Sequence, residues 1–137
     1  MTLRLIPALA LTLLPAAASA QPLAGCERIE ASTRPGMMAS RAYEAAIVDG
    51  TVRRIVLTLE NNRRSTTDFS PMGDGVSVRL TTFADPQDPR RVTAVFNRAV
   101  VGQDGMVLVE TWVRQPGADR PAYNFYRIRC RQDLPRK

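Results

Sequence analysis

Arginine recurs at every second position near the C-terminal end of the sequence, at Arg127, Arg129 and Arg131. Side chains two residues apart on a β-strand share one face, so a strand here would present three guanidinium groups in a row, about 7 Å apart. Arginine binds phosphate or carboxylate through two parallel hydrogen bonds. The spacing therefore predicts an anion-binding row, which Arg53 and Arg79 extend from other strands.

An acidic side chain from a neighbouring strand, instead of a bound anion, is the alternative partner for this row. Glu60 and Glu110 lie in other predicted strands and are the candidates. If either one neutralises the row, the arginines form an ordinary solvated sheet face that binds nothing. The position of the arginines and of nearby acids in the folded chain distinguishes an anion-binding row from a neutralised sheet face.

Catalysis is limited by the residue types that are present. The sequence contains no histidine, which excludes Ser-His-Asp triads, Cys-His pairs and imidazole general bases. Asp85 and Asp88 are the nearest approach to a carboxylate pair of the glycosidase kind. Each precedes a proline, however, where aspartate commonly serves the geometry of a turn. We expect no enzyme activity, no metal and no cofactor.

The first twenty residues have the pattern of a secretory signal peptide. Arg4 precedes an apolar run over residues 5–14, and Ala18-Ser19-Ala20 matches the small-residue cleavage pattern. The run is short for a bilayer span, so we expect export, in a bacterium to the periplasm, with no transmembrane segment. Cleavage would remove one arginine and no acid, lowering the formal net charge from +6 to +5.

The two cysteines, Cys26 and Cys130, support two alternatives. Leu-Ala-Gly-Cys at residues 23–26 matches a lipobox, which would make the chain an outer-membrane lipoprotein anchored at Cys26. Lipidation would leave Cys130 unpaired in an oxidising compartment. A Cys26–Cys130 disulfide is therefore preferred, and closing a loop of about a hundred residues stabilises a domain by roughly 4–5 kcal/mol in the chain-entropy model.

The pattern after residue 40 is strand, turn, strand. Short β-branched segments are separated by turns rich in Gly, Pro and Asp, and Asp49-Gly50 is a strong hairpin signal. This pattern predicts an all-β fold, an antiparallel meander forming a sandwich or barrel of six to eight strands. The expected organisation is a signal peptide over 1–20, an extended segment over 21–36 and one β domain over 37–137.

Aromatic residues gather in the last two predicted strands. They form either core pairs, which we favour, or an exposed platform on which sugar rings stack. Neighbours on a strand face opposite ways, so if any of these aromatics lie outside the core, Tyr123 and Phe125 are one possible surface set and Tyr126 and Ile128 the inward set.

The functional expectation is a binding protein whose arginine-rich face contacts an anionic envelope component or an acidic protein. Nucleic acid is not expected as a partner in the periplasm. The alternative is a structural accessory protein of the envelope with one protein partner. Arginines clustered on one face favour the first, and scattered arginines favour the second.

Overall fold

The computed structural model describes residues 21–32 and 40–131, so the predicted signal peptide lies outside the described residues. The described chain forms nine strands and one 3-10 turn: β1 (Ala24–Ala31), β2 (Ser40–Val48), β3 (Thr51–Leu59), β4 (Arg64–Asp68), β5 (Ser70–Gly73), β6 (Val76–Ala84), β7 (Val92–Val101), η1 (Gln103–Gly105), β8 (Met106–Arg114) and β9 (Ala122–Cys130). β1 lies within the predicted extended segment and is part of the sheet.

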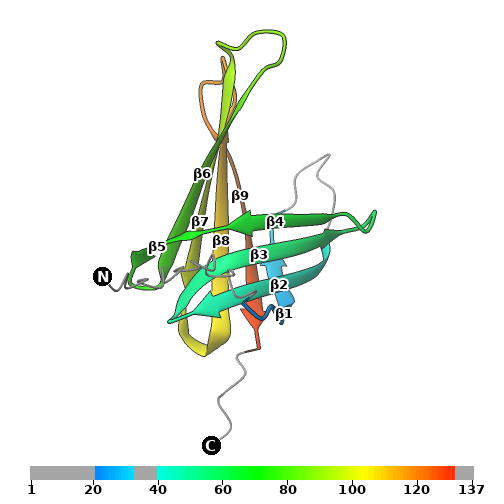
Figure 1. The fold of residues 1–137 in the computed structure, drawn as a ribbon, viewed down its shortest axis with the longest axis vertical. Helices are drawn as coiled ribbons and strands as arrows, with labels where there is room; N and C mark the ends of the chain where they lie inside the picture. Colours follow the sequence, from blue (N-terminus) through cyan, green and yellow to red (C-terminus); the bar gives the residue numbers. More distant parts are fainter. Residues whose placement is uncertain (1–20, 33–39, 132–137) are drawn as a thin grey trace, which may run out of the picture.

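The strands form one antiparallel sheet in the order β4-β3-β2-β1-β9-β8-β7-β6-β5. Figure 1 shows β2–β4 crossing the lower part of β6–β9, which gives a nearly closed, barrel-like sheet. The predicted all-β antiparallel fold is confirmed, but with nine strands rather than six to eight. The additional strand arises at Phe69, where one stretch of chain stops pairing with β3 and begins pairing with β6.

The barrel interior is filled by small and β-branched side chains. Alternation along each strand turns one set inward, as period-two geometry requires. The turn Asp49-Gly50 between β2 and β3 has positive φ at both residues, 51° and 73°, which matches the twist of a tight hairpin. The most deeply buried apolar core residues are Ala45, Ala46, Val52, Ile55, Ala99, Val107 and Ile128.

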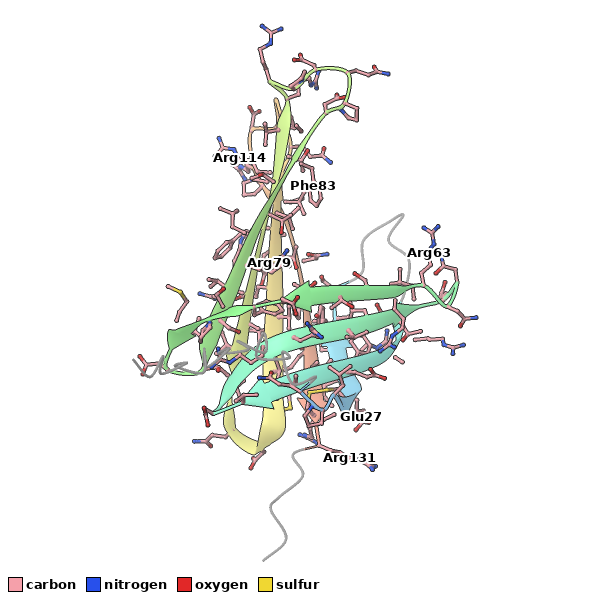
Figure 2. The ribbon with its side chains drawn as sticks, viewed as in Figure 1. Glu27, Arg63, Arg79, Phe83, Arg114 and Arg131 are labelled. Carbon is pink, nitrogen blue, oxygen red and sulfur yellow. A yellow bond between two sulfur atoms is a disulfide. The ribbon has the colours of Figure 1, made fainter. Side chains whose placement is uncertain are left out.

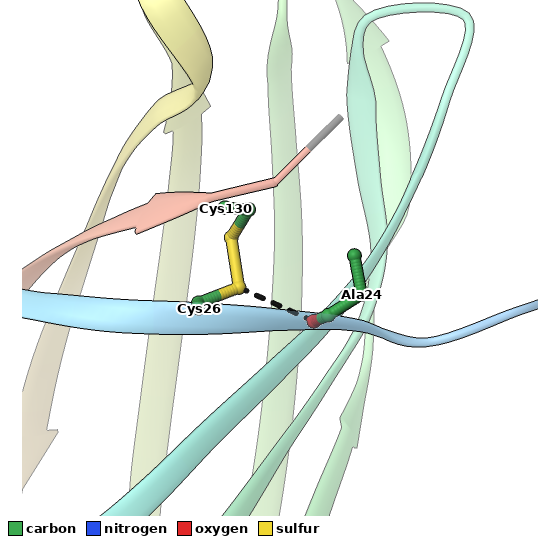
Figure 3. Close-up of a disulfide and its surroundings, with 3 residues drawn as sticks. All are labelled: Ala24, Cys26 and Cys130. Atoms are coloured by element: carbon green, nitrogen blue, oxygen red, sulfur yellow. Dashed lines mark hydrogen bonds between the residues drawn. A yellow bond between two sulfur atoms is a disulfide. The ribbon is translucent and has the colours of Figure 1, made fainter. Parts of the chain in front are cut away.

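The predicted disulfide joins Cys26 and Cys130, which lie directly opposite each other on β1 and β9 with a Cα–Cα distance of 4.1 Å. Figure 3 shows the Cys26 sulfur beside the carbonyl oxygen of Ala24, at 3.4 Å. A disulfide sulfur carries no hydrogen, so this is a contact rather than a hydrogen bond. The bridge fastens the pairing that joins the first and last strands of the domain.

Beyond the barrel, β6–β9 continue as a four-stranded arm with the loops 85–91 and 115–121 at its tip (Figure 1). Large apolar side chains are exposed on it, including Leu80 at 66% and Phe83 at 57%. These two residues lie on opposite faces, because they are three positions apart on one strand. Among the described residues, no helix is long and apolar enough to cross a membrane.

Candidate functional site

The three arginines of the predicted row project from one side of β9. Arg127, Arg129 and Arg131 are exposed, whereas Ile128 and Cys130 between them are buried. The geometry of the row follows from strand alternation. The groups around each arginine do not follow from it, and they differ among the three.

Arg127 already has an acidic neighbour. Its Nη1 lies 3.6 Å from Oε2 of Glu30, which stands opposite it on β1. The expected neutralising acids were Glu60 or Glu110, and this expectation is wrong for Glu110, which is bound by Arg98. Across residues 21–32 and 40–131, no carboxylate lies within 4 Å of the guanidinium groups of Arg129 or Arg131.

Arg53 and Arg79 do not extend the row. Arg53 is the extra residue at a register shift between β2 and β3, and its Nε is buried with no hydrogen-bond partner in the described part of the chain. Arg79 donates to the Thr81 hydroxyl at 3.2 Å and to the Asp68 carbonyl at 3.3 Å. Figure 2 shows Arg79 just above β4, far from Arg131 at the foot of the barrel.

Arg129 and Arg131 instead line a groove of about 830 Å³ beside the disulfide, here called the disulfide groove. A third guanidinium, from Arg41 on β2, lines it as well. No pattern in the sequence pointed to Arg41, a single arginine at the second position of β2. The remaining lining residues come from β1, β2, β9 and η1 and are Gly25, Cys26, Glu27, Ala42, Tyr43, Glu44, Asp104 and Cys130.

The groove opens because two strands diverge. β1 pairs with β2 only over Ala24, Gly25 and Cys26, and then continues along β9 alone. On the other wall, the register between β2 and β3 shifts at Arg41, which is exposed. A bulge of this kind turns the extra side chain away from the regular alternation.

The lining of the groove contains three arginines and three acids, Glu27, Glu44 and Asp104, so its formal charges balance. Glu44 is bound from outside the groove by Arg64, whose Nη2 lies 3.0 Å from Oε2. Glu27 stands opposite Arg129 on the neighbouring strand, beyond ion-pair distance in the described structure. With Glu44 compensated by Arg64, the three arginines of the lining are opposed by two acids, Glu27 and Asp104, which make no ion pair with them within 4 Å in the described residues.

A second polar cluster lies on the outer face of the arm. The Glu110 carboxylate accepts from Arg98 Nε at 2.8 Å, from Arg98 Nη2, and from the Tyr123 hydroxyl at 2.9 Å. The Arg98 guanidinium also lies 5.6 Å from the centroid of the Trp112 ring. Desolvation, followed by the hydrogen bond to Glu110, raises the pKa of the Tyr123 hydroxyl. These polar groups bind one another.

Aromatic rings continue across this face. Successive ring centroids are 5.7 Å apart for Phe96 and Trp112, 5.2 Å for Trp112 and Tyr123, and 6.1 Å for Tyr123 and Phe125. Tyr123 lies at the surface, 43% exposed, and Phe125 shares its face, half-buried, so the favoured interpretation of core pairs is wrong for Tyr123 and the alternative surface position is the one observed. Tyr126 packs against the core, as predicted. Phe96 was not expected here, because its place depends on the register of β7 with β8.

The loop aspartates serve turns. Asp85 Oδ1 accepts from the Gln87 backbone N–H at 2.9 Å, and Asp88 Oδ1 accepts from that of Arg90 at 3.2 Å. Among the described residues, no cluster of three or more acidic or cysteine side chains has the geometry of a metal site.

No family model, curated protein or solved structure matches this chain.

Proposed function

We propose that the protein is an exported, periplasmic binding protein that captures an anionic partner in the disulfide groove through Arg129, Arg131 and Arg41. One observation carries the proposal. Two arginines that the sequence singled out line the same groove, exposed, with no acid of the described chain within 4 Å of either.

The groove suits bidentate capture of phosphate or carboxylate, because guanidinium groups approach it from β2 and from the end of β9. The backbone that carries them is held in place. Arg131 N–H donates to the Gly25 carbonyl at 3.3 Å, next to the disulfide. A rigid frame reduces the entropy lost on binding. The partner is an anionic envelope component or an acidic protein.

The signal-peptide pattern and the disulfide support export, because disulfides persist in oxidising compartments. The Cys26 sulfur in this bridge is the atom that a lipid thioether would need. We therefore prefer the periplasmic protein over the outer-membrane lipoprotein. A structural accessory role with one protein partner is the second candidate, and the apolar outer face of the arm favours it.

The test compares two variants of the mature chain. Arg129→Ser with Arg131→Ser should weaken binding to phosphatidylglycerol vesicles and to immobilised polyglutamate by about tenfold or more, since a hydrogen bond to a charged group contributes about 1.5–3 kcal/mol. Arg127→Ser is the matched control, because it lies on the same side of β9 but is paired with Glu30. It should change binding by about twofold or less.

Binding should also fall steeply as salt rises, because exposed charges are screened beyond about 8 Å at physiological ionic strength. Equal losses in the control and in the double variant would overturn the proposal. So would binding that the double substitution leaves intact at low salt.

A further inference from the structure

The outer face of β6–β9 is apolar over most of its length. Leu80, Phe96, Trp112 and Tyr123 stand directly opposite one another on four neighbouring strands. Leu80 is 66% exposed and Tyr123 is 43% exposed. The adjoining row carries Val78 and Phe125 on either side of the Arg98–Glu110 pair.

A sheet face that meets water normally carries polar side chains, in alternation with the core. Here the outward set is apolar, and contiguous exposed apolar patches mark interaction surfaces. The polar groups beside the aromatic row are already engaged, since Glu110 is 9% exposed and bound by Arg98 and Tyr123. Apart from Thr82 and Arg114 toward the tip of the arm, few hydrogen-bonding groups remain for a sugar, so stacking of a glycan is disfavoured.

A bilayer is disfavoured as well. The loops at the tip of the arm carry Asp85, Asp88, Arg90, Arg91 and Asp119. Burying such charges in hydrocarbon costs several kcal/mol each. The surface therefore fits an apolar protein face.

We propose that this face binds the same face of a second copy of the chain, giving a two-fold symmetric dimer with the two sheets packed as a sandwich. A two-fold contact places a surface against itself, so unpaired charge at its centre would repel. Arg98 and Glu110 cancel within each copy. The other charges of this face are Arg114, one row toward the tip of the arm from Trp112, and Arg127 at the opposite end, which is paired with Glu30.

The available area is of the right order. Nine residues at about 3.3 Å along β6 and four strands about 4.8 Å apart define a face of roughly 30 Å by 19 Å. Because side chains project from the plane of the sheet, the accessible area of the face is larger than this flat area. It approaches the value of about 800 Å² that each partner buries in a standard interface. Arg129 lies one row beyond this area and Arg131 two, so the dimer leaves them outside.

The experiment is analytical ultracentrifugation of the mature chain across a concentration series at low and high salt. We expect a reversible dimer that high salt leaves intact, because apolar burial holds it. Trp112 is the sole tryptophan and lies in the proposed interface, so its emission should shift to longer wavelength as the dimer is diluted.

Leu80→Glu should raise the dimer dissociation constant by about tenfold or more, and Leu80→Ser is a milder second variant. Phe83→Glu is the matched control, because Phe83 is exposed on the same strand but on the opposite face. It should leave the dimer and the Trp112 emission unchanged. Far-UV circular dichroism checks folding of each variant.

A wild-type chain that stays monomeric throughout would overturn the proposal, whatever other partner it captures. A dimer that Phe83→Glu disrupts as strongly as Leu80→Glu, or one that dissociates in salt, would overturn it too. The salt response separates this result from the proposed function, whose binding must weaken with salt.

Discussion

Arg127, Arg129 and Arg131 share one side of β9, yet their surroundings give them different chemistry. Arg127 is compensated by Glu30, whereas Arg129 and Arg131 open onto the disulfide groove. The spacing that places them together is local and can be recognised from the sequence. The compensating acid cannot, because Glu30 reaches Arg127 only through the pairing of the first strand with the last.

The Tyr126 hydroxyl makes the free energy of unfolding depend on pH. Burial, and then the neighbouring Tyr43, raises the pKa of the Tyr126 hydroxyl above its ordinary value of 10.0. The unfolded chain releases this proton first, so the associated stability is complete below about pH 10 and is lost as pH rises further. Between pH 8 and 11 this one group should remove about 1.4 kcal/mol from the free energy of unfolding.

Urea unfolding of the wild type and of Tyr126→Phe at both pH values measures this contribution. The variant lacks the ionising group, so its stability should fall less between the two. Equal losses in the two proteins would show that Tyr126 titrates normally in the fold.

At the scale of elements, strands with apolar alternation could be predicted, and strands without it could not. β6 carries such a pattern, whereas β4 consists of polar, mostly exposed residues. Its pairing with β3 comes from closure of the sheet, which no local pattern encodes.

The candidate site could likewise be predicted only in part. Arg129 and Arg131 were predictable from spacing, but the inclusion of Arg41 depends on a bulge and on the divergence of β1 from β2.

The turn η1 supports the end of β9 through Gly105. A Cβ at this position would lie 2.6 Å from the Cys130 carbonyl oxygen, and its φ is +72°. Gly105→Ala should therefore suffer both left-handed strain and a backbone clash. Gly117 is the matched control, since its φ is +77° but no atom lies within 4 Å of the added Cβ.

In thermal or urea unfolding, Gly117→Ala should lower the free energy of unfolding by about 1–2 kcal/mol through strain alone. Gly105→Ala should lower it by about 1 kcal/mol or more beyond that, which is the lower end of an overpacking penalty. Losses of the same size would mean that the chain around Cys130 moves aside without cost.

The whole molecule presents two surfaces of different chemistry. The disulfide groove at the foot of the barrel offers arginine side chains, and the outer face of the arm offers mainly apolar side chains. The barrel keeps both in fixed positions, because one continuous sheet carries them. In the proposed dimer, one assembly would carry two copies of the proposed anion-binding groove, and paired sites raise avidity for a partner that repeats its charge.

Export of the whole chain predicts a definite covalent form. Protein isolated from its native envelope, without reduction, should have the intact mass of residues 21–137 with one disulfide, beginning at Gln21 or at its pyroglutamate. Alkylation of the denatured, unreduced protein should add nothing, because both cysteines are in the bridge. Verified reduction should then lower the melting temperature by several degrees, since the bridge closes a loop across 104 residues. A mass that includes fatty acyl chains on Cys26, with one alkylated thiol at Cys130, would establish the lipoprotein instead.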